Sequence, residues 1–160
     1  MKDSEPHVEH SEGLSSGVFV GSFVHLLDPK RRLTIPSEWR DISGTPGTLY
    51  VLPGIDQTCL CVFPAQELVQ RLKTIRSHSI ADQKARQFAR VLGSQSQLLP
   101  WDSQGRIRIK DELLESAKLV NQVVLVGAFE RFELWDPVLW KASGSMDRAN
   151  LIDAARYVGI

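Results

Sequence analysis

The chain has 160 residues, of which 42% are hydrophobic and 24% charged, a composition typical of a globular protein with a buried core. Its positive and negative side chains are equal in number, which excludes a uniformly basic surface, so any phosphate-binding surface must be a local patch. No segment approaches the roughly 18 apolar residues of a membrane-spanning helix, and the acidic start of the chain lacks the features of a signal peptide. We therefore expect a soluble, cytoplasmic protein.

The first part of the chain predicts a short β-rich unit behind a disordered tail. Residues 1–17 are rich in Glu, Ser, His and Gly and show no apolar periodicity. A strand then leads to a turn at Asp28, and in the next strand Leu33 and Ile35 alternate with polar residues, which predicts one buried and one polar face. A short helix is predicted from Pro36, whose fixed φ suits a first helical position.

Two further strands, over residues 49–52 and 60–63, complete the unit before its final helix. Gly54 lies between them, where a hairpin often needs a positive φ. A connecting helix is predicted over residues 79–92, with Ser79 as its N-cap and an apolar stripe along one face. Three cations lie off that stripe, and they form either a solvated face or a supplementary phosphate contact: Lys84, Arg86 and Arg90.

A second copy of the unit follows at a fixed offset of 74 residues, because Asp28 to Ile35 aligns without gaps on Asp102 to Ile109. The copy predicts the same order of elements, β-β-α-β-β-α. Asp111 is its expected N-cap for the short helix, and Asp136 followed by a proline is the expected start of the last helix. Gly127 occupies the place of Gly54.

The two cysteines do not predict a disulfide or a metal site. Cys59 and Cys61 lie two residues apart, and on an extended strand such residues point the same way at a separation unsuited to a mutual disulfide. A zinc site needs about two more ligands, and the nearest histidine, His78, lies well beyond the strand. We therefore expect no metal and no cofactor, with small side chains facing the core.

The repeated motif Asp-x-x-x-Arg is the candidate site, at Asp28 to Arg32 and at Asp102 to Arg106. A carboxylate beside DNA is repelled by phosphate unless it is paired, so the two aspartates are interpreted as structural turn residues. Gly105 is also interpreted as a structural turn residue. Arginine pairs in a bidentate manner with guanine, whereas lysine acts as a point charge on phosphate. The candidate DNA contacts are Lys30, Arg31, Arg32, Gln104, Arg106 and Arg108.

Composition and spacing leave other interpretations of the motif open. It also fits a turn brace buried at the interface of two repeats, or a face that holds a protein partner. An enzyme is not expected, because no grouping of Ser, His and Asp stands out, and His25 near the motif is interpreted as a half-exposed strand residue. No small-molecule substrate is expected either.

At these residues the chain resembles the MraZ family, regulators of the bacterial division and cell-wall gene cluster. The first motif, Asp28 to Pro36, is similar to the family pattern D-x-K-G-R-L-x-x-P, and the second, Asp102 to Ile107, to D-x-x-G-R. A longer match covers residues 126–136, and the whole resemblance spans about residues 19–142. Arg31 departs from the pattern at its glycine, and Lys110 replaces the usual proline of the second copy.

The resemblance implies a mixed α+β, β-rich fold of two tandem swapped-hairpin modules of the AbrB type, forming a pseudo-dimer within the chain. It also implies a nucleoid-associated repressor that assembles as a ring-shaped homo-oligomer on G-containing direct repeats in its own promoter. The expected organisation is a tail over 1–17, modules over 18–78 and 93–144, a connecting helix over 79–92, and a C-terminal segment over 145–160. The alternative is a protein-binding module of the antitoxin type.

Overall fold

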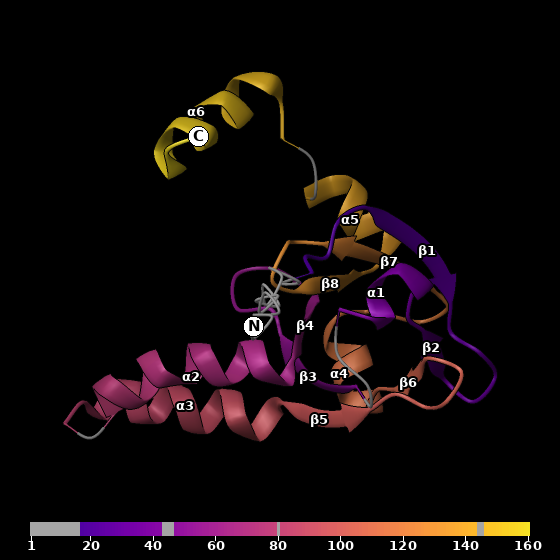
Figure 1. Ribbon diagram of the computed structural model, residues 1–160, viewed down its shortest axis with the longest axis horizontal. Helices are drawn as coiled ribbons and strands as arrows, with labels where there is room; N and C mark the ends of the chain where they lie inside the picture. Colours follow the sequence, from indigo (N-terminus) through magenta and orange to yellow (C-terminus); the bar gives the residue numbers. More distant parts are fainter. Residues whose placement is uncertain (1–16, 43–46, 80, 144–145) are drawn as a thin grey trace, which may run out of the picture.

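The computed structural model describes residues 17–42, 47–79, 81–143 and 146–160, so the predicted tail lies almost wholly outside the described residues. The fold is mixed α+β, as predicted (Figure 1), and its paired strands are antiparallel. The elements, in chain order, are β1 (Ser22–Leu26), β2 (Arg32–Thr34), α1 (Ser37–Arg40), β3 (Thr48–Pro53), β4 (Leu60–Pro64), α2 (Ala65–Ser79), α3 (Gln83–Gln95), β5 (Gln97–Pro100), β6 (Arg106–Arg108), α4 (Asp111–Ser116), β7 (Gln122–Gly127), β8 (Phe132–Trp135), α5 (Pro137–Ser143) and α6 (Arg148–Val158).

The strands form a six-stranded sheet in the order β1-β7-β8-β4-β3-β5 and a separate two-stranded ribbon of β2 and β6. Strands from the two halves of the sequence interleave: β1 pairs with β7, β5 pairs with β3, and β4 and β8 meet at the centre. The equivalent strands of the two copies are β1 and β5, β3 and β7, and β4 and β8. Exchanging them gives the same order read from the opposite edge of the sheet. The division into two modules with the boundaries given above stays a prediction.

The core lies between the ribbon and the sheet and confirms the predicted alternation. Leu33, Ile35, Ile107 and Ile109 are each no more than 1% exposed, whereas the polar residues between them are not buried. Trp39 packs among them and donates from Nε1 to the carbonyl of Val20 at 3.1 Å. Burial of the apolar side chains from both ribbon strands therefore fixes which face of the ribbon remains open.

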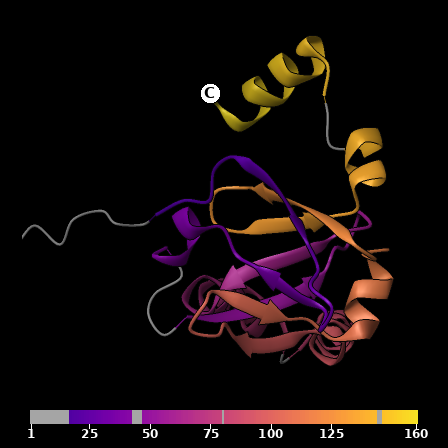
Figure 2. The ribbon, with the colours of Figure 1, turned by 90° about the vertical axis from the view of Figure 1, so that its right-hand side faces the viewer.

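A smaller apolar cluster joins α2 and α3 to the sheet. These helices lie side by side against β3 and β4 (Figure 1), with Leu68 of α2 buried against Leu52 and Phe63. Leu72 and Leu92 pack on the same cluster. At the other end of the chain, α6 lies apart from the strands (Figure 2). Among the described residues, no helix is both long enough and apolar enough to cross a membrane.

The predicted connecting helix is wrong in its start. The helix α2 continues to Ser79, which is its last residue rather than an N-cap, and α3 begins only at Gln83. Asp82 is the N-cap, because its carboxylate accepts from the backbone N–H groups of Lys84 at 2.9 Å and Ala85 at 3.4 Å. A carboxylate with both acceptor bonds in place caps a helix well, so α3 starts there and runs on to Gln95.

Two other local predictions also need correction. Asp111 is the first residue of α4, and its cap is Lys110, whose φ of −56° and ψ of 144° almost repeat the −51° and 138° of Pro36. Lysine therefore adopts at this position the backbone that proline imposes in the first copy. Gly54 and Gly127 lack a positive φ. A Cβ would instead collide with backbone atoms, those of the same hairpin loop at Gly54 and those of residues 19–20 at Gly127. The cap at Asp136 is confirmed, since its carboxylate accepts from two backbone N–H groups at 3.0 Å.

Candidate nucleic-acid interface

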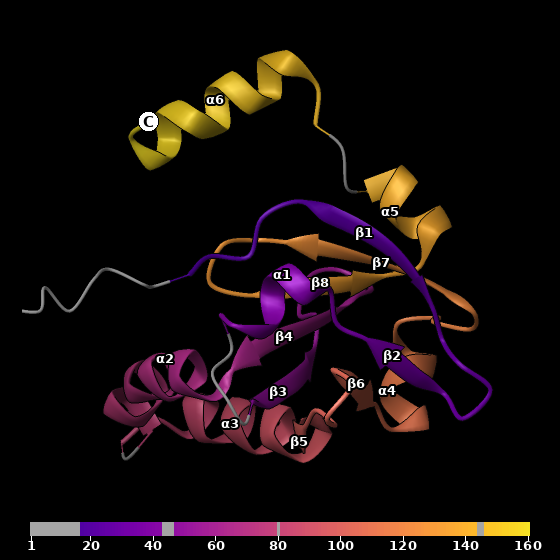
Figure 3. The ribbon, with the colours of Figure 1, turned by 45° about the vertical axis from the view of Figure 1, so that its right-hand side comes forward.

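The ribbon places the charged residues of both motifs on one surface. Strands β2 and β6 lie side by side as a separate ribbon (Figure 3) and run antiparallel. Arg32 lies opposite Arg108, and Thr34 lies opposite Arg106. Alternate side chains of a strand share a face, so these four lie on the face opposite to the buried Leu33. Arg32 and Arg106 are diagonal neighbours, which in an antiparallel ladder lie about 7–8 Å apart.

In the first turn, Asp28 holds both the backbone and the side chain of Arg32. Its Oδ1 accepts from the Arg32 backbone N–H at 2.7 Å, and its Oδ2 accepts from Arg32 Nε at 2.7 Å. Backbone hydrogen bonds close the same turn, from Asp28 N to the Arg32 carbonyl at 2.9 Å and from Arg31 N to the Asp28 carbonyl at 2.8 Å. The Arg32 guanidinium is therefore held by an aspartate whose own backbone is fixed within the hydrogen-bonded turn.

The second turn has the same contacts at the equivalent positions. Asp102 Oδ1 accepts from the backbone N–H of Arg106 at 3.0 Å and of Gln104 at 2.8 Å, while Oδ2 accepts from Arg106 Nε at 2.7 Å. Backbone bonds again close the turn, including Gly105 N to the Asp102 carbonyl at 3.0 Å. Two copies of one sequence motif thus form one three-dimensional arrangement, once at each end of the ribbon.

Both aspartates are held ionised by these contacts. The backbone N–H of Arg32 is the largest cause that lowers the pKa of Asp28, followed by the hydrogen bond and charge of its guanidinium. The backbone N–H of Arg106 lowers the pKa of Asp102 in the same way. Near neutral pH each turn therefore contains a carboxylate already paired with its own arginine, which removes much of its repulsion for an approaching anion.

The turns differ at the residue before each arginine. Arg31 has a φ of 64° and Gly105 a φ of 74°, so both copies need the left-handed conformation that glycine adopts without strain. Arg31 accepts that strain and donates from Nη1 to the carbonyl of Val120 at 2.8 Å. The guanidinium of Arg40 lies against Gly105, and this flexible side chain would have to shift if position 105 carried a Cβ.

The remaining predicted DNA contacts also lie on the ribbon or its turns, but they differ in how many hydrogen bonds their side chains already make within the protein. Lys30 and Gln104 are exposed at the tips of the two turns. Arg108 is engaged locally, because its Nη2 donates to Asp111 Oδ1 at 3.1 Å and its Nη1 donates to the carbonyl of Ile109. Arg108 is thus less available to a ligand than Lys30.

Two neighbours of the turns were not among the predicted residues. Arg40 of α1 donates from Nε to the carbonyl of Ile35 at 3.0 Å and lies against Gly105, which no spacing rule in the sequence indicates. His25 is half-exposed on β1, as predicted, and its Nδ1 lies 2.6 Å from the carbonyl of Thr34. Because a carbonyl only accepts, that nitrogen carries the proton.

The cations of α3 belong to another part of the surface. Lys84, Arg86 and Arg90 are exposed on α3, whose C-terminal end leads into β5 near the ribbon and whose N-terminal end points away from the ribbon (Figure 1). They do not extend the cluster formed by the turns, so the candidate interface consists of the two turns and the ribbon face between them.

Comparison with known proteins finds similarity in both halves of the chain. The family model described as "MraZ protein, putative antitoxin-like" matches residues 94–156. The chain is 33% identical over 129 residues to the transcriptional regulator MraZ of Thermomicrobium roseum, covering 81% of this chain and 89% of the relative.

Two other relatives with the same name show similar coverage. The MraZ of Finegoldia magna is 30% identical over 138 residues, which is 86% of this chain and 94% of the relative. The MraZ of Lactiplantibacillus plantarum is 33% identical over 138 residues, which is 86% of this chain and 96% of the relative. These names describe regulators of transcription rather than enzymes, in agreement with the expectation from the sequence.

Proposed function

Because the chain belongs to the MraZ family of transcriptional regulators, we propose that it binds double-stranded DNA through the two aspartate-braced turns and represses the division and cell-wall operon that encodes it. The observation that carries this proposal is the repeated contact between aspartate and arginine Nε, at 2.7 Å in both turns. DNA binding would also place the protein on the nucleoid.

The aspartates prepare each arginine for one kind of contact. With Nε committed to the carboxylate, Arg32 and Arg106 present their two terminal nitrogens as a planar fork. Within the described part of the chain, no other hydrogen bond uses those nitrogens. Such a fork matches the O6 and N7 acceptors of guanine, a pair worth about 1–3 kcal/mol of discrimination against the wrong base.

Exposed groups at the turn tips supply the remaining contacts. Lys30 is a point charge suited to a phosphate, and Gln104 is suited to a base edge or a phosphate. The backbones of the two arginines are diagonal neighbours about 7–8 Å apart on one ribbon, so both forks face one short stretch of duplex. One chain would then read a short G-containing element.

Assembly of several chains would join such short elements into direct repeats, and the proposed form is a ring-shaped homo-oligomer. Strand β1 lies at one edge of the sheet and exposes Val24 and Leu26, which are 60% and 64% exposed. An unpaired edge with apolar side chains favours contact between protein chains. Linked turns then bind successive repeats at high effective concentration, which offsets weak individual contacts.

An electrophoretic shift with the DNA upstream of its own operon tests the proposal. We expect Arg32→Lys to keep most of the salt dependence and to lose about tenfold or more in preference for the repeats over random DNA, because lysine cannot form the fork. Arg90→Lys on α3 is the matched control and should leave that preference unchanged. Equal preference in wild type and Arg32→Lys would remove the proposed role of the turn.

The second candidate function is binding of a protein partner, as the words "antitoxin-like" in the matching family model imply for that family. The same ribbon face would then hold another chain in place of DNA. Co-purification of the product of a neighbouring gene, with loss of the complex in Arg32→Ala and no DNA shift by the purified protein, would favour this function.

A further inference from the structure

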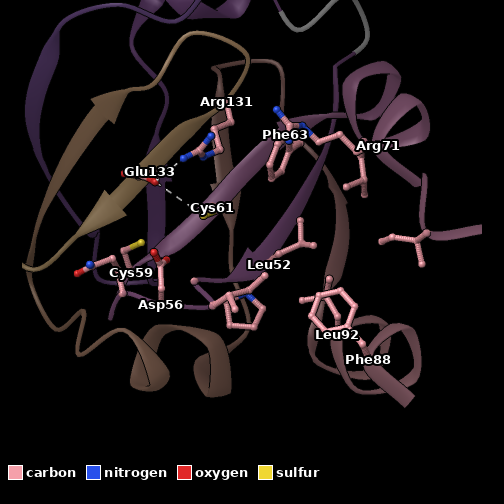
Figure 4. A pocket seen from close by; sticks show the side chains of 16 residues that line it. Leu52, Asp56, Cys59, Cys61, Phe63, Arg71, Phe88, Leu92, Arg131 and Glu133 are labelled. Carbon is pink, nitrogen blue, oxygen red and sulfur yellow. Dashed lines mark hydrogen bonds and ion pairs between the residues drawn. The ribbon is translucent and has the colours of Figure 1, made fainter. Parts of the chain in front are cut away.

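Three groups of metal-ligating type converge at the centre of the six-stranded sheet, away from the ribbon. The sulfur atoms of Cys59 and Cys61 and a carboxylate oxygen of Glu133 all lie within 4.8 Å of one another. They line a cavity of about 320 Å³ between β4, β8 and the α2–α3 pair (Figure 4). Neither cysteine is in a disulfide.

Strand pairing explains why the sequence did not reveal this cluster. Cys61 of β4 lies directly opposite Glu133 of β8, and Cys59, two residues before Cys61, points to the same face. The third group therefore comes from the other half of the chain. A search for ligands nearby in sequence, which led to the expectation of no metal, misses a ligand supplied by a cross-strand partner.

The chemistry of the three groups selects a class of ion. Two sulfur ligands and one oxygen suit a thiophilic divalent ion such as Zn²⁺, with bonds of about 2.3 Å to sulfur and about 2.0–2.2 Å to oxygen. A separation of up to 4.8 Å between ligand atoms is within a small side-chain rotation of that geometry. Asp56 lines the same cavity, which leaves the fourth position open to its carboxylate or to water.

The hydrogen-bond partners of Glu133 orient its carboxylate and balance the charge of the proposed site. Its Oε2 accepts from Arg131 Nη2 at 3.2 Å and lies 4.0 Å from Cys61 Sγ, and its Oε1 accepts from Trp135 Nε1 at 3.2 Å. Two thiolates, one carboxylate and a divalent ion leave one negative charge, which the guanidinium of Arg131 balances. These hydrogen bonds also orient the carboxylate, as partners of metal ligands commonly do.

We propose that Cys59, Cys61 and Glu133 bind one thiophilic divalent ion, which ties β4 to β8 where the two halves of the sequence meet. Binding releases any protons that the thiols carry and adds a bridge between residues 72 positions apart in the chain, Cys61 and Glu133. The bridge stabilises the folded state by mass action, because the unfolded chain does not hold the three groups together.

Titration of the reduced, tag-free protein with Co²⁺ tests the proposal. We expect one equivalent of cobalt to give a thiolate-to-cobalt charge-transfer band in the near ultraviolet, which cobalt bound to histidine does not show, and Zn²⁺ to abolish the band. Zn²⁺ should also raise the melting temperature of the wild type. Absence of the charge-transfer band would overturn the proposal.

Variants at the cluster separate this site from adventitious binding. Cys61→Ser should abolish the band and the rise in melting temperature, and Glu133→Gln should weaken cobalt binding by at least about tenfold. Glu115→Gln, an exposed carboxylate on α4 outside the cavity, is the control and should keep wild-type affinity. Melting without metal shows that each variant is folded. A band that persists unchanged in folded Cys61→Ser, or an equal loss in Glu115→Gln, would contradict the assignment.

Discussion

Replacing Arg31 with glycine should relieve backbone strain in the first turn while weakening DNA binding. The φ of 64° places Arg31 in the left-handed region, which costs a residue with a side chain about 1–2 kcal/mol. Glycine removes that strain but has about 0.5–1 kcal/mol more conformational entropy to lose on folding. The exposed hydrogen bond to Val120 is lost as well.

The variant Arg31→Ala isolates the backbone contribution, because it loses the same charge and hydrogen bond but keeps the strained φ. The remaining difference, strain relieved less entropy, predicts that Arg31→Gly is about 1 kcal/mol more stable than Arg31→Ala. With a urea dependence of about 1–3 kcal/mol per molar, the midpoint of unfolding should differ by about 0.3–1 M. Both variants should lose DNA affinity equally.

Urea unfolding followed by circular dichroism, at one fixed chain concentration so that assembly does not differ, measures the two midpoints. Equal midpoints, or a lower midpoint for Arg31→Gly, would show that the backbone strain at Arg31 does not exceed the entropy that glycine loses on folding, and would contradict the prediction. An unequal loss of DNA affinity would show that the backbone of the turn, and not only the charge of Arg31, determines binding.

Three further predictions concern the turns. Gly105→Ala should destabilise the fold by about 1–2 kcal/mol in urea unfolding, because its φ of 74° is strained for a residue with a side chain. Gly93→Ala, which has open space in a helix, should instead stabilise the fold by about 0.5–1 kcal/mol. The pKa values of Asp28 and Asp102 lie below their usual 3.8, so their contribution to stability is present above that pH and is lost as the pH falls through the lowered values. The double variant with both aspartates replaced by Asn should be less stable than the wild type at pH 7. Its free energy of unfolding should also fall less than that of the wild type between about pH 5 and 2. Lys30→Ala should reduce the slope of log affinity against log salt by about 0.9 for any DNA sequence, and an unchanged slope would show that Lys30 contacts no phosphate.

The sequence predicted those features that depend on alternation and repetition. The period of two in Leu33 and Ile35, repeated at Ile107 and Ile109, gave the buried face of the ribbon correctly, because burial of one strand face leaves little choice of register. The offset between Asp28 and Asp102 likewise located two turns that share the same hydrogen bonds.

The start of α3 was not predicted, because two nearby residues are equally suitable helix caps. Ser79 and Asp82 are both good caps, and only the continuation of α2 through Ser79 leaves Asp82 as the start of α3. Contacts between distant segments were also missed: Arg40 against Gly105, and Glu133 opposite Cys61. Each arises from packing or strand pairing that local sequence does not encode.

The most direct measurement of the central claim is a selection of bound fragments from random double-stranded DNA, made in parallel with wild type and with the double variant Arg32→Lys and Arg106→Lys. If the braced arginines read guanines, the wild type enriches G-containing direct repeats at a fixed spacing, while the double variant still binds DNA and enriches no sequence. Enrichment of the same repeats by both proteins, or of none by the wild type, would contradict the account.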